Sequence, residues 1–250
     1  MIPMLENLMV YLKNELKVKL YSKGYRMVGI GESTIEKALT GFYEKHPLVK
    51  IAPYAGVGEL KYVFTSSDEK SLMETMNHFH NQFSEYIYGS LEDTLEGVIV
   101  EKLIEKNMII SMSESCTGGL ISSKIVNVSG SSKVFKESFV TYSNEAKIKH
   151  LGVKEETLKT LGAVSEETAF EMAKGNAFNT NADIVISVTG IAGPTGDSPE
   201  KPIGLTYFGL YHKGVTKTYK KIFNGNREMV RTRATSFALN LVRKELLKIK

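Results

Sequence analysis

The 250-residue chain contains a single cysteine, which excludes an intrachain disulfide framework. Globular chains without disulfides are typical of reducing compartments, and we therefore expect a cytoplasmic protein. No apolar run reaches the length of a transmembrane helix, and the N-terminus does not have the layout of a signal peptide. We expect no association with a membrane.

Basic clusters and metal-ligand patterns are lacking as well. The net charge of +4 is spread along the chain, without a run of five or six lysines or arginines, so composition gives no reason to expect nucleic acid as a partner. The histidines and the cysteine have no metal-ligand spacing, and His78 and His80 would point to different sides of a helix. A Walker A motif and a dinucleotide fingerprint are both missing. We expect no metal and no cofactor.

An apolar fraction of 42% is enough for a sizeable core, and the pattern of elements divides the chain near the polar stretch 89–93. Residues 1–90 are predicted to form a small α+β domain. It is expected to open with a helix whose apolar residues are Leu5, Leu8, Met9, Leu12 and Leu16. The elements expected after it are a strand at 25–29, a helix starting with a capping box at 33–36, a strand at 60–65 and a helix from 66–69 toward Tyr86.

Residues 91–250 are predicted to alternate between strands and helices, beginning with a helix capped through Ser90 and Asp93. The expected strands are 108–112, 138–142, 184–188, 204–211 and 215–223, and the expected helices are 120–126, 145–150, 166–179 and 228–247. The last two strands flank His212-Lys213-Gly214 and indicate an antiparallel hairpin. The pattern predicts an α/β fold, a three-layer α/β/α sandwich around a mostly parallel, mixed sheet.

The stretch 114–119, with the sequence ESCTGG, joins a predicted strand to a predicted helix. Backbone N–H groups at such a turn can hold an anion, and Ser115 could be a nucleophile beside them. A helix-capping serine is the alternative. Cys116 is a rival nucleophile, but no histidine lies in a motif that suggests pairing, and a small buried side chain is the favoured interpretation.

A second strand-to-helix turn carries Tyr142 and Lys147, with Ser143 or Asn144 as the helix cap. A lysine near the positive end of a helix dipole has a depressed pKa, which favours the neutral amine that a general base requires. Ser–Lys pairs are a known alternative to Ser–His–Asp. The alternative is a solvated surface lysine.

Two further segments suggest ligand binding. Thr189 ends a strand that runs into a glycine-rich loop, where open α/β sheets bind ligands. Arg227 and Arg231 lie on one face near the start of the last helix and could clamp a phosphate. A tight loop and a solvated basic face are the respective alternatives.

Six segments in one order resemble the C-terminal domain of the competence/damage-inducible protein CinA, the nicotinamide-nucleotide amidase family. They are ESCTGG (114–119), YSNEAK (142–147), GAVS (162–165), TGIAGP (189–194), EKP (200–202) and GNR (225–227). The first ninety residues resemble CinA's middle, KH-like segment through GIGES (29–33) and YIYG (86–89). The resemblance implies that the family's N-terminal molybdopterin-binding-like domain, with the ADP-ribose pyrophosphatase activity attributed to it, is absent.

The resemblance implies hydrolysis of the carboxamide of nicotinamide mononucleotide to nicotinic acid mononucleotide and ammonia, in pyridine nucleotide salvage. It assigns catalysis to Ser115 as nucleophile and to Lys147, with Tyr142, as base. It also suggests a homodimer. The expected substrate-binding residues are Thr117, Gly118, Gly119, Asn144, Thr189, Gly190, Arg227 and Arg231.

Two alternatives remain at this stage. The chain could be a non-catalytic, competence-related module that binds nucleic acid or protein, although its first ninety residues lack the GxxG loop of KH domains. It could also be a serine amidase for a different small amide. Whether the 117–119 turn holds the oxyanion or the phosphate is left open.

Overall fold

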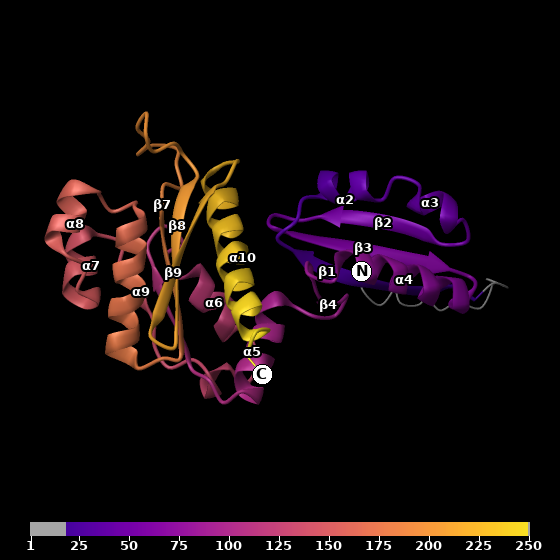
Figure 1. The fold of residues 1–250 in the computed structure, drawn as a ribbon, viewed down its shortest axis with the longest axis horizontal. Helices are drawn as coiled ribbons and strands as arrows, with labels where there is room; N and C mark the ends of the chain where they lie inside the picture. The colour runs from indigo at the N-terminus through magenta and orange to yellow at the C-terminus, as the bar shows by residue number, and fades with distance from the viewer. Residues whose placement is uncertain (1–18, 250) are drawn as a thin grey trace, which may run out of the picture. The chain divides into compact units, whose positions relative to one another are not determined.

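The computed structural model describes residues 19–249 of the chain (Figure 1). The helix predicted from the leucines between positions 5 and 16 lies outside the described residues. The chain divides into two compact units, of which the first ends at Leu91 and leaves out the turn Gly56–Glu59. Within the described range, no helix is long and apolar enough to cross a membrane.

The first unit is an α+β fold around a four-stranded sheet with the strand order β2-β3-β1-β4. Its elements, in chain order, are β1 (Tyr21–Val28), α2 (Glu32–Ala38), α3 (Phe42–Lys45), β2 (Lys50–Ala55), β3 (Glu59–Ser66), α4 (Glu69–Phe83) and β4 (Ile87–Ser90). Strand β3 alternates between half-buried and buried residues along its whole length, as its sequence predicts.

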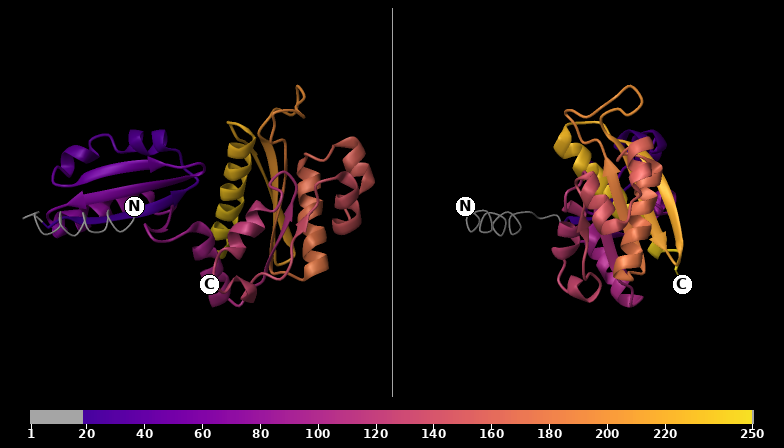
Figure 2. Two further views of the ribbon diagram at one scale, coloured as in Figure 1. Left: turned by 180° about the vertical axis from the view of Figure 1, so that it is seen from behind. Right: turned by 90° about the vertical axis from the view of Figure 1, so that its left-hand side faces the viewer.

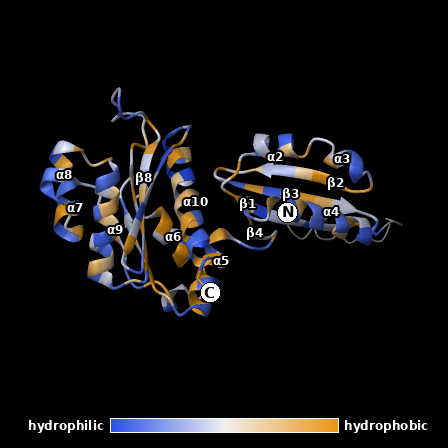
Figure 3. Ribbon diagram, viewed as in Figure 1, coloured by the Kyte–Doolittle hydropathy of each residue, from blue (hydrophilic) through white to orange (hydrophobic). Residues whose placement is uncertain are grey.

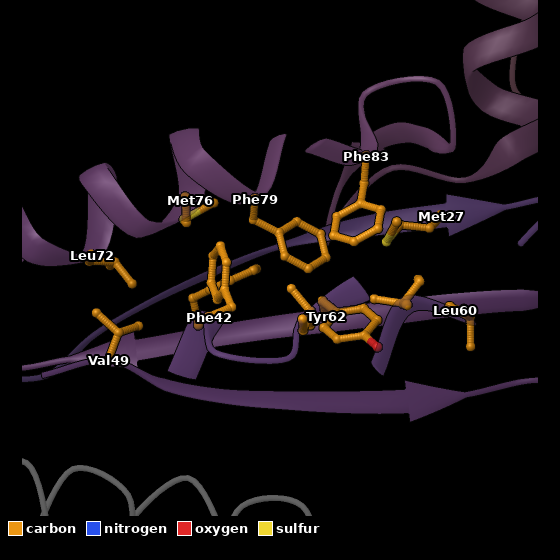
Figure 4. Close-up of a cluster of buried hydrophobic side chains, with 12 residues drawn as sticks. Met27, Phe42, Val49, Leu60, Tyr62, Leu72, Met76, Phe79 and Phe83 are labelled. Carbon is orange, nitrogen blue, oxygen red and sulfur yellow. The ribbon is translucent and has the colours of Figure 1, made fainter. Parts of the chain in front are cut away.

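An aromatic cluster forms the core of the first unit. Phe79, on α4, is in ring contact with Tyr62 and Phe64 of β3 and with Phe42 of α3 (Figure 4). These side chains are almost completely buried, and aromatic pairs of this kind add stabilisation beyond the area that they bury. The first unit therefore has a core of its own.

The second unit carries the longer alternation of strands and helices. Its elements are α5 (Leu95–Glu105), β5 (Ile110–Glu114), α6 (Leu120–Val126), η1 (Ser131–Lys133), β6 (Phe139–Val140), α7 (Asn144–Leu151), α8 (Glu155–Thr160), α9 (Glu166–Thr180), β7 (Ile184–Gly190), β8 (Leu205–His212), β9 (Val215–Ile222) and α10 (Arg227–Leu246).

The five strands form one mixed sheet with the order β6-β5-β7-β8-β9. Strand β5 pairs in parallel with both β6 and β7, whereas the β7–β8 and β8–β9 pairs are antiparallel. The hairpin between β8 and β9 turns at Lys213 and Gly214, both with positive φ, as a two-residue turn of this type requires. The predicted hairpin is confirmed.

Helices cover both faces of this sheet (Figures 1 and 2). Helix α9 packs on β7 and β8 with α7 against it, and α10 packs on the other face with α5 and α6. Hydrophobic residues line only part of the surface of α10 (Figure 3), and buried residues such as Val230, Ala234, Leu239 and Val242 recur along it. The predicted α/β/α arrangement with a mixed sheet is confirmed.

Two predicted helix starts are wrong. Helix α2 begins after Gly31 rather than with a capping box at Ser33, and α5 is capped by Thr94, whose side chain accepts a hydrogen bond from the Gly97 N–H. Ser90 instead ends strand β4. A cap is defined by the chain geometry just before the helix, and Ser/Thr/Asp spacing alone does not fix that position.

Candidate active site

The carboxyl ends of the parallel strands β5 and β7 meet at one edge of the second sheet, where open α/β folds bind ligands. A cavity of about 230 Å³ opens there. Figure 1 shows the connection from β7 to β8 projecting beyond the same end of the sheet at which α10 begins. The residues around the cavity are Ser115, Cys116, Tyr142, Lys147, Ala163, Val164, Thr189, Gly190, Ile191, Ala192, Gly193, Thr195, Gly196 and Arg227.

Ser115 and Lys147 lie in direct contact at this cavity. Ser115 is the first residue after β5, and its N–H donates to the carbonyl of Val188 on the neighbouring strand β7. Lys147 lies on α7, which is capped by the Ser143 side chain. The distance between Lys147 Nζ and Ser115 Oγ is 3.1 Å, which is within hydrogen-bond reach.

The surroundings of Lys147 favour a neutral amine. Its side chain is only 1% exposed, and burial lowers the pKa of the Lys147 ammonium from 10.5 to about 8. Its other close partners are two backbone carbonyls, Thr141 O at 2.8 Å and Tyr142 O at 3.4 Å. A neutral amine has two N–H donors and one lone pair, which match two carbonyls and one serine hydroxyl. The geometry is that of a base facing its proton donor.

Cys116 is not equipped to be the nucleophile. The side chain is buried, and burial raises the pKa of the Cys116 thiol to about 12, so that the thiolate is scarce at neutral pH. The interpretation of Cys116 as a small buried side chain agrees with this environment.

The backbone N–H groups at the start of α6 are occupied by a side chain of the protein itself. Glu114 is fully buried at the end of β5, and its carboxylate accepts hydrogen bonds from the N–H groups of Gly119, Ile121 and Ser122 and from the Ser122 hydroxyl, at 2.7–3.1 Å. This carboxylate compensates the positive end of the helix dipole. The start of α6 therefore does not offer these donors to a ligand.

Arg231 also faces the backbone of the turn rather than the cavity. Its Nε donates to the carbonyl of Cys116 at 3.1 Å, and its Nη2 donates to the carbonyl of Thr117 at 2.8 Å. Gly118 and Gly119 follow with φ of 60° and 92°, a conformation that favours glycine. Arg231 thus holds the turn that follows Ser115.

Arg227 and Tyr142 form the rim of the cavity. Tyr142 is 62% exposed, and its hydroxyl accepts a hydrogen bond from Arg227 Nη2 at 3.0 Å. Arg227 Nη1 donates to the carbonyl of Gly193 in the glycine-rich loop, at 2.8 Å. The Tyr142 hydroxyl thus pairs with the arginine, and only the Tyr142 carbonyl contacts Lys147. The guanidinium offers a positive charge at the cavity mouth.

Thr189 and Gly190 line the side of the cavity formed by β7. The Thr189 hydroxyl donates to the carbonyl of Ala163 at 2.6 Å, which ties the strand to the segment before α9. A Cβ on Gly190 would lie 2.7 Å from the Thr206 hydroxyl oxygen, too close for a side chain. Gly190 therefore has a packing reason to be glycine, in addition to its place at the cavity.

The structure brings six of the predicted site residues to the cavity and leaves five away from it. Ser115, Tyr142, Lys147, Thr189, Gly190 and Arg227 line it. The predicted binding residues outside its lining are Thr117, Gly118, Gly119, Asn144 and Arg231. The Thr117 hydroxyl is buried, and Asn144 is an exposed residue in the first turn of α7.

Sequence reasoning did not assign a role to Glu114, Ala163 or Val164, and it named the glycine-rich loop after Thr189 only as a whole, as a lining of the nucleotide site. A signal for Glu114 was present, since a carboxylate at the end of a strand lies within reach of the helix that starts six residues later.

Across residues 19–249, no group of three or more His, Cys, Asp or Glu side chains could hold a metal ion.

A larger cavity of about 690 Å³ lies at the other end of the sheet, beside Asp183 before β7 and His212 at the end of β8. The Asp183 carboxylate there accepts the N–H of Ile109, and His212 Nδ1 pairs with Glu245. Its lining contains no serine, threonine or cysteine nucleophile. We place the chemistry at the smaller cavity for that reason.

The comparison with known families concerns the second unit. The family model of the CinA C-terminal domain matches residues 92–246, which cover the whole sheet and the cavity. A CinA-like protein of Kosmotoga olearia is 48% identical over 252 residues. The chain belongs to the CinA C-terminal domain family.

The CinA relatives are longer than this chain. The chain is covered to 98% in the alignment with the Kosmotoga protein and spans 61% of its length. The putative competence-damage inducible protein of Caldicellulosiruptor saccharolyticus is 43% identical, with the same two coverages. A crystal structure of a CinA superfamily protein from Escherichia coli has a TM-score of 0.58 at 34% identity, over 60% of this chain and 88% of that one.

Proposed function

We propose that the second unit hydrolyses the carboxamide of nicotinamide mononucleotide to nicotinic acid mononucleotide and ammonia. The contact of 3.1 Å between Ser115 Oγ and Lys147 Nζ carries the proposal, because it joins a nucleophile to a base of lowered pKa inside a cavity. An unactivated amide requires such an activated nucleophile. Membership of the CinA family supports the choice of this amide.

In the proposed reaction, Ser115 Oγ bonds to the carboxamide carbon while its proton passes to Lys147 Nζ. The electron pair of the C=O bond moves onto oxygen and gives a tetrahedral anion. When the anion collapses, the C–N bond breaks, and the proton on Lys147 goes to the nitrogen, which leaves as ammonia. Water then attacks the acyl-serine with Lys147 as base, which releases the carboxylic acid and restores Ser115.

Arg227 supplies the phosphate recognition in this proposal. Its guanidinium lies at the cavity mouth, where it contacts the Tyr142 hydroxyl and the Gly193 carbonyl. Guanidinium groups bind phosphate through paired N–H donors, which both of these nitrogens offer. Tyr142 then has a role in holding Arg227, and Lys147 acts as the base on its own.

The first unit is the KH-like segment of CinA in the same proposal, and the protein acts in the cytoplasm as a homodimer. Its helix α4 packs on a four-stranded sheet with an aromatic core. Its sequence has no run of five or six lysines or arginines, so composition gives no reason to expect nucleic acid as its partner. We assign the catalysis to the second unit alone.

Ammonia release from three amides tests the proposed function. Nicotinamide mononucleotide, nicotinamide riboside and free nicotinamide share the carboxamide and differ in the phosphate and the ribose. We expect a strong preference for the mononucleotide, slow turnover of the riboside and no release by Ser115→Ala. Equal rates with all three would indicate an amidase without phosphate recognition, and no release from any of them would exclude the amidase.

The rate of ammonia release is expected to rise with pH and to level off above about pH 8. Lys147 acts as the neutral amine, and with a pKa of about 8 the neutral fraction is about a quarter at pH 7.5. The measurement is kcat between about pH 7 and pH 10.5, mostly above the titration of the substrate phosphate, whose second pKa is about 6. A rise that continues toward pH 10.5 would mean that Lys147 is not desolvated, and a flat profile would argue against a lysine base.

A further inference from the structure

The turn after Ser115 leaves two backbone N–H groups without an oxygen acceptor; the Cys116 N–H faces only its own thiol. The Gly118 N–H donates to the Ser115 carbonyl and the Leu120 N–H to the Thr117 carbonyl. Gly119 and the first turn of α6 donate to the Glu114 carboxylate. Among the described residues, the N–H groups of Cys116 and Thr117 have no such partner, although both residues are buried. Buried N–H groups are rarely left unpaired, so these two are available to a ligand oxygen.

Arg231 acts from the opposite side on one of these two peptide units and on the unit that follows it. Its bond to the Cys116 carbonyl falls on the peptide that carries the Thr117 N–H, and its bond to the Thr117 carbonyl falls on the peptide that carries the Gly118 N–H. A peptide unit is planar and trans, so its N–H points away from its C=O. Fixing the Cys116 carbonyl therefore also fixes the direction of the Thr117 N–H.

We propose that Arg231 is a positioning residue that aims the Thr117 N–H group, next to the Cys116 N–H, at the carboxamide oxygen as it becomes negative. The inference rests on the proposed function, since it needs Ser115 as the nucleophile. The guanidinium also draws electron density toward the Cys116 carbonyl, which makes the Thr117 N–H a stronger donor. The oxyanion lies with these two donors, and the phosphate lies with Arg227 at the cavity mouth.

The two arginines are on one helix and have different expected effects. Arg231→Ala should lower kcat by about 10- to 100-fold. This loss is somewhat smaller than that caused by removing an oxyanion donor itself. The factor should be the same for the mononucleotide and the riboside. Its KM values should stay near those of the wild type. Arg227→Ala should raise KM for the mononucleotide and leave the riboside unchanged.

Arg233→Ala is the matched control. Arg233 is two residues further along α10 and contacts the carbonyl of Asn224, away from the Ser115 turn. We expect wild-type kinetics for it. Arg231→Lys keeps the charge but cannot form the same two parallel bonds, so it should regain only part of kcat. If the alanine variant does not fold, the kcat of Arg231→Lys can be measured in its place.

A fluorophosphonate probe separates this inference from the choice of substrate. The probe bonds to an activated serine and places negative charge on its phosphonyl oxygen, so its rate of reaction with Ser115 depends on the same donors. We expect Arg231→Ala to slow labelling by about the same 10- to 100-fold as kcat, as followed by intact mass. If the wild type is labelled but hydrolyses no amide, the substrate is wrong and labelling still tests Arg231.

Three results would overturn the inference. One is an Arg231→Ala variant with labelling and kcat within twofold of the wild type. Another is a selective rise in KM for the mononucleotide, which would make Arg231 a phosphate ligand. A wild type that resists the probe at Ser115 would also overturn it, because no activated serine would then exist for the turn to serve.

Discussion

Lys147→Met is expected to lower kcat for ammonia release by about 10²- to 10⁴-fold, because it removes the base that takes the Ser115 proton. Methionine has a similar length and fills the same buried space without a charge. KM should change little, since Lys147 contacts Ser115 and two backbone carbonyls of its own turn. Steady-state kinetics with nicotinamide mononucleotide measure both constants.

The same variant is expected to keep or raise the thermal stability at pH 7. The folded pKa of Lys147 is lowered from 10.5 to about 8, so at pH 7 the fold holds a buried charge at a cost of about 3 kcal/mol. Between about pH 8 and 10.5 the unfolded lysine is protonated while the folded one is neutral. Wild-type stability therefore rises with pH in that window, and the methionine variant should lack this rise.

Lys149→Met is the control for both measurements, because Lys149 is exposed on the same helix. It should match the wild type in kcat and in the pH dependence of unfolding. Near-wild-type kcat in Lys147→Met would exclude Lys147 as the base. A strong loss of stability at pH 7 would instead show that its hydrogen bonds outweigh the burial of its charge.

The second unit could be largely predicted from the sequence because its strands are short apolar runs separated by glycine-rich turns and amphipathic helices. Helix α6 was predicted with its observed bounds, and β5 was predicted two residues too early. That shift arises because Ser113 and Glu114 are polar and yet fully buried within β5. Composition could not indicate that the Glu114 carboxylate would be buried against the N–H groups at the start of α6.

The first unit shows where local patterns fail. Strand β2 was not predicted. It contains Pro53, and proline in a sequence argues against a central strand. Its place at the edge of the sheet makes the proline tolerable, and edge position is a property of the whole fold. Strand β4 has only four residues and lies in the stretch that also looked like a turn. Both strands depend on partners far along the chain.

For the site, the resemblance to the CinA family paired the serine with the lysine, and the structure shows that each follows one of two parallel strands of one sheet. The sequence could not show which acceptor each N–H group of the turn bonds to: the oxyanion, the phosphate or a group of the protein itself. That depends on where the Glu114 and Arg231 side chains point. Arg227 and Arg231 share a helix face in the sequence pattern. In the structure, Arg227 lies at the cavity mouth, whereas Arg231, one helical turn later, contacts the backbone of the turn that follows Ser115.

Glu114→Ala is expected to destabilise the second unit by about 3 kcal/mol or more. It removes the acceptor of three backbone N–H groups and one hydroxyl, and a buried donor without a partner costs about 1–3 kcal/mol. For a unit of this size the melting temperature should fall by roughly 6–12 °C. Activity should fall as well, because the freed N–H groups no longer hold the turn that carries Ser115.

Glu155→Ala is the matched control, since Glu155 is an exposed glutamate in the first turn of α8 that pairs with Lys159 at 3.1 Å. Exposed pairs of this kind contribute about 0.3–0.5 kcal/mol, so its melting temperature should fall by only about 1–2 °C. Amide hydrogen exchange then localises the effect. Faster exchange at Gly119, Ile121 and Ser122 in Glu114→Ala is the expected result. Unchanged protection there would mean that water replaces the carboxylate, and the Ser115 turn would not depend on Glu114.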